Sequence, residues 1–205
     1  MLLAGNLVLK LGLLALLLFG TLSPDLPQFE GKAFGARLVA YGLVTLLVPA
    51  VWLLLGRERR GTPYPHWIDI LVVVPFFMDT AGNAMHLYDT VTWFDDLMHF
   101  LTWVPWAMAF GLALHAAPEL PRWAHAGLVV GFGAVTHILW ELGEYVTFVR
   151  DNPNEYRTAY TDTLGDLSLS LMGSVVAAVL VGTVLWNYGR SLRSGATTDT
   201  VGAGG

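Results

Sequence analysis

Six long apolar segments fill most of this 205-residue chain, and each is close to the length that crosses a bilayer as a helix. Hydrophobic residues make up 55% of the sequence and charged residues only 13%, which leaves too little polar sequence for a separate soluble domain. The predicted spans are residues 3–22, 38–55, 67–87, 94–114, 123–148 and 164–186.

A helix satisfies its own backbone hydrogen bonds within lipid, so these segments predict an all-α fold, a polytopic transmembrane helical bundle with about six spans. Residues 1–193 form a single transmembrane helical domain in this prediction, and the small, polar residues 194–205 form a disordered cytoplasmic tail. Cysteine is absent, which excludes a disulfide framework, a thiolate metal site and a cysteine nucleophile.

Basic residues give the expected orientation, because short loops rich in Lys and Arg stay in the cytoplasm. They gather in the second and fourth loops and at the C-terminal end: Arg57, Arg59, Arg60, Arg122, Arg190 and Arg193. Since six spans return the chain to the side on which it started, we expect both termini in the cytoplasm. The opposite loops also carry positive charge, at Lys32, Arg37, Arg150 and Arg157, so the bias is limited.

Polar side chains interrupt four of the six segments at a similar depth. They are Asp79, Asn83 and His86; Asp95 and His99; His137, Glu141 and Glu144; and Asp162 and Asp166. Within each group the residues are three or four apart, so they share one face of a helix. A charged residue within a span costs roughly 3 kcal/mol on insertion scales, so such residues normally face the bundle interior and have partners there. We therefore expect four polar stripes to meet near the outer side of the bundle.

Helix capping is the structural alternative for two of the acids. Thr92-x-x-Asp95 and Thr163-x-x-Asp166 both have the spacing of a capping box, and an acid in a first helical turn also suits the helix dipole. Under this interpretation Asp95 and Asp166 would mark the beginnings of helices rather than a binding site.

The glutamates of the fifth segment do not fit a capping role. Glu141 and Glu144 fall in its last turns, where the helix dipole disfavours negative charge, so they need a positive partner. Ion pairs with Arg150 or Arg157 would supply one, although two arginines do not neutralise all of the acids. His137 lies one turn before Glu141, and it is either a hydrogen-bonded core histidine or a ligand. A bound cation is the remaining explanation.

The polar residues of the third segment are expected to support this site. Asp79, Asn83 and His86 would orient the ligands by hydrogen bonds, with direct binding by Asp79 as the alternative. Other polar residues near the predicted cytoplasmic ends are assigned to the membrane interface: Lys10, His66, Asp69, His115 and His125. Gly127-x-x-x-Gly131 and Gly173 with Ser174 are expected to let helices approach closely.

Three stretches resemble a known family: residues 94–100 (FDDLMHF), residues 140–145 (WELGEY), and residues 162–167 (DTLGDL) followed by Gly173. They are similar to the pattern of the YjdF-like family of predicted bacterial inner-membrane proteins, and the resemblance covers roughly the C-terminal two thirds of the chain. It implies shared positions at Asp95, His99, Glu141, Glu144, Asp162 and Asp166. Asp96 falls at a variable position of that pattern. The family has no assigned reaction, so the resemblance implies a multi-pass protein of a bacterial or archaeal cytoplasmic membrane and names no substrate.

Carboxylates and imidazoles without sulfur favour a divalent metal such as Zn²⁺, Mn²⁺, Fe²⁺ or Mg²⁺. The predicted ligands are Asp95, His99, His137, Glu141 and Asp166, and the further ligands or general base are Glu144 and Asp162. A metal with an open position polarises an ester or phosphoester and activates water. The leading hypothesis is a metal-dependent membrane hydrolase that acts on a lipid-linked substrate from the outer side, with sites for one or two metals.

Two alternatives remain at this point. Chains of acids and histidines also mark ion pathways, so the protein is alternatively a transporter or channel for protons or divalent cations. It is otherwise a non-catalytic membrane subunit or sensor that uses the same groups as a buried structural network. Nucleic acid is not an expected partner, because the net charge is −5 and no base-reading module is present.

Overall fold

The computed structural model describes residues 2–56, 63–117, 119–150 and 153–194. Regular structure within these residues is helical throughout. The elements are α1 (Leu2–Leu22), α2 (Phe34–Gly56), α3 (His66–Ala84), α4 (Leu87–Thr90), α5 (Phe94–Leu114), α6 (Arg122–Glu144), the π-helix η1 (Tyr145–Val149), α7 (Pro153–Gly182) and α8 (Trp186–Ser194). The predicted tail beyond residue 194 and the basic residues Arg57, Arg59 and Arg60 lie outside the described residues.

Six of these helices are long and apolar enough to cross a membrane, which confirms the all-α bundle with about six spans. The first, second and fourth predicted segments agree closely with α1, α2 and α5. The third span ends earlier than predicted, at Ala84, and the expected connector around Asp89 is the short helix α4. The fifth continues from α6 into η1.

The boundaries of the sixth segment were wrong. Its helix α7 begins at Pro153, well before residue 164, and it ends at Gly182 rather than at residue 186. Proline is favoured in the first turn of a helix because its missing N–H needs no partner there. Hydropathy detects only the apolar part of such a helix, so the polar first turns were assigned to a loop. The residues from Trp186 onward form the separate helix α8.

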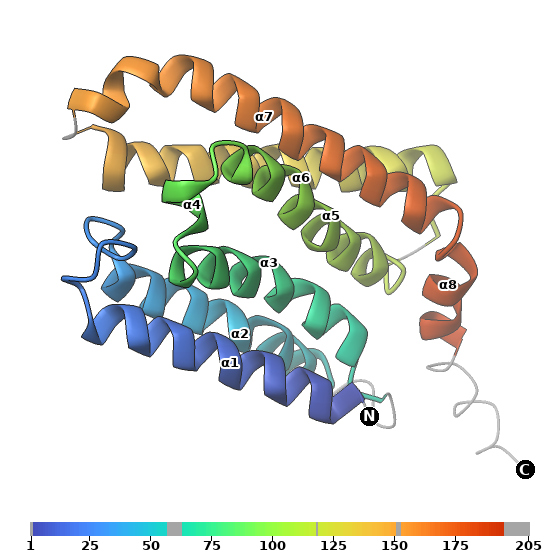
Figure 1. Cartoon of the computed structure of the whole chain (residues 1–205). Helices are drawn as coiled ribbons and strands as arrows, with labels where there is room; N and C mark the ends of the chain where they lie inside the picture. The colour runs from blue at the N-terminus through green and yellow to red at the C-terminus, as the bar shows by residue number, and fades with distance from the viewer. Residues whose placement is uncertain (1, 57–62, 118, 151–152, 195–205) are drawn as a thin grey trace, which may run out of the picture.

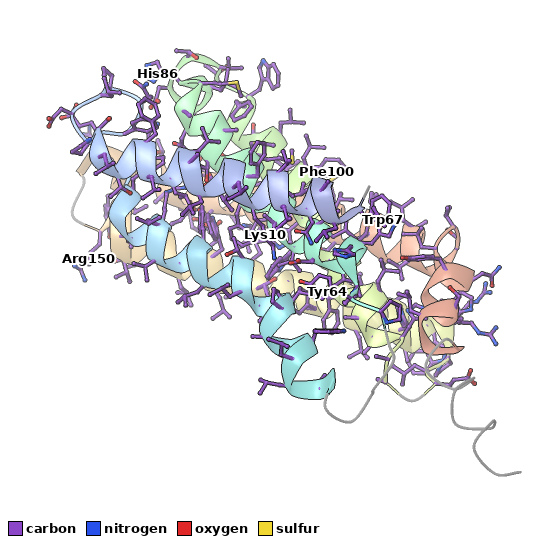
Figure 2. The ribbon with its side chains drawn as sticks, turned by 90° about the horizontal axis from the view of Figure 1, so that it is seen from below. Lys10, Tyr64, Trp67, His86, Phe100 and Arg150 are labelled. Atoms are coloured by element: carbon purple, nitrogen blue, oxygen red, sulfur yellow. The ribbon has the colours of Figure 1, made fainter. Side chains whose placement is uncertain are left out.

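The spans form two groups of three (Figure 1). Helices α1, α2 and α3 pack on one another, as do α5, α6 and α7, and the contact between α3 and α5 joins the two groups. Figure 1 shows the N-terminus and α8 at one end of the bundle, and α4 and the start of α7 at the other. In the view of Figure 2, His86 and Arg150 lie at the α4 end and Trp67 at the α8 end.

A buried ion pair binds α1 to α3, which corrects two expectations. Lys10 Nζ lies 2.7 Å from Asp69 Oδ2 and also donates to the carbonyl oxygen of Thr45 at 2.8 Å. Asn6 and Tyr64 donate to the same carboxylate oxygen at 2.6 and 2.5 Å. Because Asp69 is only 1% exposed, neither Lys10 nor Asp69 is an interfacial side chain. The apolar character of α1 and α3 concealed this pairing, since sequence alone does not show which helices are neighbours.

Small residues bring α5, α6 and α7 close together. A Cβ atom added at Gly173 of α7 would lie 2.5 Å from the carbonyl oxygen of Phe100 and 3.2 Å from Cβ of Trp103, both on α5. A Cβ added at Gly133 of α6 would collide with the buried side chain of Ser174. Gly127 and Gly131, by contrast, have nothing within 4 Å of an added Cβ, so their expected role in close packing was wrong.

This difference predicts opposite effects of two alanine substitutions. Gly173→Ala should destabilise the protein by about 1–3 kcal/mol, because the backbone of Phe100 cannot move away as a flexible side chain would. Gly127→Ala should leave stability unchanged or raise it by up to about 1 kcal/mol, because alanine favours the helix and meets open space. Thermal unfolding of the purified protein in one detergent measures both. Equal midpoints for the two variants would contradict the close approach of α5 and α7.

Candidate metal centre

His99 of α5 belongs to two groups of ligand-type side chains, each with its ligand atoms within 4.8 Å of one another. The first group is His99 with His137 and Glu141 of α6, and the second is His99 with Asp95 of α5 and Asp166 of α7. The three helices that pack most closely therefore each contribute to one centre. We refer to these five residues, with the neighbouring Glu144 and Asp162, as the acid–histidine cluster.

The first group is deeply buried. His137 is 1% exposed, and its ring centroid lies 5.2 Å from that of His99. His137 Nε2 approaches Glu141 Oε1 to 2.8 Å, yet neither atom has a partner in hydrogen-bond geometry. The other oxygen of Glu141 accepts a hydrogen bond from the Thr163 hydroxyl at 3.1 Å. Buried polar atoms normally have hydrogen-bond partners, so these ligand-type atoms have capacity for a cation.

The second group has the spacing expected around a shared ion. His99 Nε2 lies 3.6 Å from Asp95 Oδ1 and 3.5 Å from Asp166 Oδ1, which is too long for a good hydrogen bond. Two nitrogen or oxygen ligands on one tetrahedral Zn²⁺ lie roughly 3.4 Å apart, since each is about 2.1 Å from the metal. The donor set and its spacing therefore fit a divalent metal.

An indole ring holds the two histidines in position. Trp103, one turn beyond His99 on α5, stacks on the His99 ring at 6.1 Å between centroids and contacts the edge of His137 at 4.5 Å. Its own Nε1–H donates to the carbonyl oxygen of Gly133 at 3.0 Å. The Ser170 hydroxyl donates to the carbonyl oxygen of His99 at 3.1 Å, which attaches α7 to the same turn of α5. The imidazoles are thus positioned by packing rather than left mobile.

A cavity of about 700 Å³ reaches the second group. This volume lies within the range of roughly 300–1,000 Å³ that is usual for small-molecule sites. His99, Asp95 and Asp166 line it, but His137 and Glu141 do not. Other lining residues supply a mixed polar and aromatic wall: Glu144, Asp162, Phe76, Trp103, Trp106 and Trp140. The second group therefore faces the space that a substrate would occupy, whereas His137 and Glu141 of the first group lie outside the cavity wall.

The basic residues that line this cavity are already paired with acids outside the cluster. Lys32 Nζ lies 2.5 Å from Asp89 Oδ2, and Arg37 forms an ion pair with Asp79. The closest ion pairs of both basic side chains thus lie outside the cluster, and Arg37 also attracts Glu144 at longer range. Like charges a few ångströms apart repel strongly in a medium of low dielectric constant, so a cation in the cluster would lower the free energy of this arrangement.

Asp79 has a different position from the one expected for a residue that orients the ligands. Its Oδ2 accepts from Arg37 and from the Tyr41 hydroxyl at 2.8 Å, and its Oδ1 accepts from Tyr88 at 3.0 Å and Asn83 at 3.3 Å. Burial, together with the negative charge of Asp79, raises the pKa of Tyr88, so this hydroxyl stays protonated and donates. Asp79 and Asn83 line the cavity, but both oxygens of Asp79 are used to connect α2, α3 and the α4 turn.

His86 does not reach the cluster. It has a left-handed backbone conformation before α4, with φ of 61°, and its Nδ1 lies 3.0 Å from Asp89 Oδ2 near the surface. Helix α3 ends at Ala84, and the left-handed conformation of His86 turns the chain away from the helical path. The His86 side chain is therefore not on the face of α3. His86 therefore does not belong with Asp79 and Asn83, although the spacing along the sequence placed it on their face.

The predicted capping box forms at neither acid, although Asp95 does lie in the first turn of α5, where an acid suits the helix dipole. Helix α5 begins at Phe94 with Trp93 as its N-cap, and no side chain caps it, so Thr92 does not form the predicted box. Thr163 lies inside α7, where no helix begins, and its hydroxyl binds Glu141 instead.

Sequence reasoning missed several contributors to the site. Arg37, Tyr41 and Tyr88 were not singled out, and their contacts with Asp79 depend on three helices meeting. Thr163 is part of the Asp-Thr-x-x-Asp motif at residues 162–166. The motif therefore pointed to this threonine, but helix capping was the simpler explanation for it. Trp103 continues the stripe of Asp95 and His99 at a spacing of four residues, which would have placed it beside them.

Comparison with known proteins adds a family to this geometry. The family described as Predicted membrane protein (DUF2238) matches residues 6–187. The chain belongs to this family. The match fits the resemblance to the uncharacterised YjdF-like membrane proteins, and it covers every residue of the cluster and all of the spans except the start of the first. Neither the curated proteins nor the solved structures give a match.

The shared position of His99 predicts that one substitution removes metal binding from the acid–histidine cluster. His99→Ala should abolish the Zn²⁺ or Mn²⁺ bound at this cluster, because both groups lose a ligand. Thr163→Val should weaken affinity by roughly 10- to 100-fold, the usual loss when the hydrogen-bond partner of a ligand is removed. Mass spectrometric metal analysis and calorimetric titration of detergent-purified protein measure these effects.

Two matched variants serve as controls for this measurement. Thr161→Val alters an exposed threonine of the same helix whose hydroxyl binds the carbonyl oxygen of Thr158. Asp96→Asn alters the acid next to Asp95 that belongs to neither group. Both should bind metal as the natural protein does. Unchanged binding by His99→Ala would show that these groups are not a metal centre.

Proposed function

We propose that this protein is a membrane-embedded, metal-dependent hydrolase that acts on a lipid-linked substrate. The observation that carries the proposal is the cavity-facing group of Asp95, His99 and Asp166, with two further carboxylates, Glu144 and Asp162, in the same cavity wall. Such a set provides both ligands and a spare base. A catalytic metal site needs an open position, and a group that faces a cavity offers one.

The division of labour follows from the positions of the carboxylates. Asp95, His99 and Asp166 would hold a divalent metal, which would supply a Lewis acid that polarises the ester or phosphoester oxygen and makes water more acidic. Glu144 or Asp162 then takes a proton from the attacking water, and the same carboxylic acid returns it to the departing alcohol. Water adds across the bond, so no other reactant is needed. His137 and Glu141 stabilise the centre from behind, outside the cavity wall.

A lipid-linked substrate fits the position and the walls of the cavity. The cluster lies within the spans, towards the end of the bundle that carries α4, and aromatic side chains such as Trp106 and Trp140 line the space beside it. Aromatic and acidic walls together suit a molecule with a polar reacting group and an apolar chain. A soluble substrate without an apolar chain would not need the aromatic part of the cavity wall.

The buried cores support an enzyme over an ion pathway. Ala107, Val129 and Ala177, on α5, α6 and α7, are fully buried and pack together farther along these helices than the cluster. Val72 on α3 and Ala109 on α5 form a second buried core on the other side of α5. A pathway for ions must reach both faces, and the buried residues of these two cores are apolar.

Glutamine at one position tests the chemistry separately from metal binding. Glu144→Gln should keep the metal content and the unfolding temperature but lower hydrolysis of lipid-linked esters or phosphoesters by roughly 10²- to 10⁴-fold, the usual contribution of a general base. Asp162→Asn is examined in parallel, and Asp96→Asn is the matched control. If every variant that keeps its metal also keeps full activity, or if the loaded natural protein hydrolyses none of a panel of such lipids, the proposal is wrong.

We further propose that the cluster faces the extracytoplasmic side of a bacterial or archaeal cytoplasmic membrane, with both termini in the cytoplasm. The chain has no cysteine, so single cysteines report the orientation directly. An impermeant thiol reagent should label Asp89→Cys on intact cells, and it should label Ser191→Cys of α8 only after permeabilisation. The reverse pattern would overturn this orientation.

A further inference from the structure

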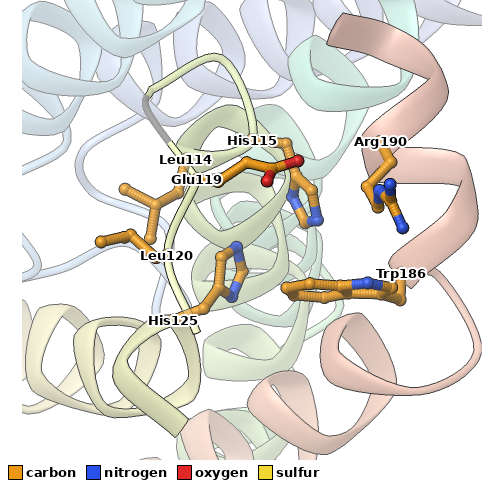
Figure 3. A pocket seen from close by; sticks show the side chains of 7 residues that line it. All are labelled: Leu114, His115, Glu119, Leu120, His125, Trp186 and Arg190. Atoms are coloured by element: carbon orange, nitrogen blue, oxygen red, sulfur yellow. The ribbon is translucent and has the colours of Figure 1, made fainter. Parts of the chain in front are cut away.

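A second cavity lies at the opposite end of the bundle, where α5 ends, α6 begins and α8 folds back (Figure 3). Its volume is about 170 Å³. Its polar and aromatic lining consists of His115, Glu119, His125, Trp186 and Arg190. None of these residues belongs to the acid–histidine cluster, so the proposed hydrolysis makes no use of them.

Two buried imidazoles face each other in this cavity. The ring centroids of His115 and His125 are 4.6 Å apart, and both rings contact Trp186, at 5.0 and 5.3 Å. His115 is 7% exposed and His125 only 3%. They were expected at the membrane interface, but α8 covers them. A Cβ atom added at Gly189 of α8 would lie 2.6 Å from the His115 ring, so this helix fits closely over it.

The hydrogen bonds of this pair are those of metal ligands. His115 Nδ1 lies 3.0 Å from the carbonyl oxygen of Gly111. A carbonyl only accepts, so Nδ1 carries the proton and Nε2 of the neutral ring carries the lone pair. Metal-binding histidines are usually held by this kind of contact to the backbone. Neither ring nitrogen of His125 has a partner in good hydrogen-bond geometry, although the residue is almost completely buried. Figure 3 shows the His125 ring directed towards His115 and Trp186.

We propose that His115 and His125 bind one divalent transition-metal ion at this end of the bundle. Imidazole suits Zn²⁺, Ni²⁺ and Cu²⁺, and the absence of cysteine sulfur excludes a thiolate site. Glu119 lines the same cavity but does not form a ligand group with the two imidazoles, so water would complete the coordination. Arg190 gives the cavity a cation as well, so binding of an anion such as phosphate is the outcome to be distinguished.

The two sites lie on the same pair of helices but are separate. On α5 the positions of His99 and His115 are about 24 Å apart along the axis, at 1.5 Å per residue. The buried core of Ala107, Val129 and Ala177 lies between them. Since this core holds no ligand groups, we expect each site to fill independently of the other, and the second site does not depend on the proposed hydrolase activity.

The experiment counts bound metal in the full chain after the first site has been removed. In detergent-purified His99→Ala protein, titration with Ni²⁺ or Zn²⁺ should still show one bound ion per chain. The double variant His99→Ala/His125→Ala should lose it. His99→Ala/His66→Ala is the matched control, because His66 lies at the same end on α3 and contacts Tyr64 rather than this cavity, and it should keep the ion.

A milder double variant, His99→Ala/His125→Gln, guards against a folding defect, since glutamine keeps the size and polarity of the side chain. It should unfold at the same temperature as His99→Ala but gain no stability from added Ni²⁺ or Zn²⁺. Equal metal binding with and without His125 would overturn the proposal. So would a protein that inorganic phosphate stabilises and these metals do not, because the site would then be an anion site.

Discussion

Charge that enters the bilayer has to be neutralised within the bundle, and this requirement organises the whole structure. The first three helices meet it with ion pairs: Lys10 neutralises Asp69, and Arg37 neutralises Asp79. Around His99 the last three spans place several carboxylates together, while the closest ion pairs of Lys32 and Arg37 lie outside the cluster. A low dielectric constant makes such an arrangement costly without a cation. This distribution of charge is the physical reason for the proposed metal.

The two groups of helices have different tasks as a result. Helices α1 to α3 form a scaffold. Ion pairs and hydrogen bonds hold it together at two levels, around Asp69 and around Asp79. Helices α5 to α7 approach closely at Gly133 and Gly173, and this brings His99 close to His137 of α6 in one ligand group and to Asp166 of α7 in the other. The cavity lies between the two groups of helices, so the scaffold supplies its far wall through Arg37 and Asp79.

The sequence predicted the spans and the polar stripes because hydropathy and helical spacing are local properties. Asp95 with His99 and His137 with Glu141 lie on common faces as the spacing of four residues requires. His86 failed the same rule, because a left-handed residue ends the regular face of α3. Capping by Thr163 failed because α7 begins much earlier than its apolar part, and a polar helical extension resembles a loop in hydropathy.

The sequence by itself determined that the chain crosses a membrane about six times and that acids and histidines lie at one depth, since both follow from composition and the helical repeat. Only the tertiary structure decided which charges pair, because pairing depends on which helices are neighbours. The tertiary structure places Lys10 next to Asp69, makes His99 a member of both ligand groups, and covers His115 and His125 with α8. These contacts join residues far apart in the chain, so the local spacing of residues in the sequence does not reveal them.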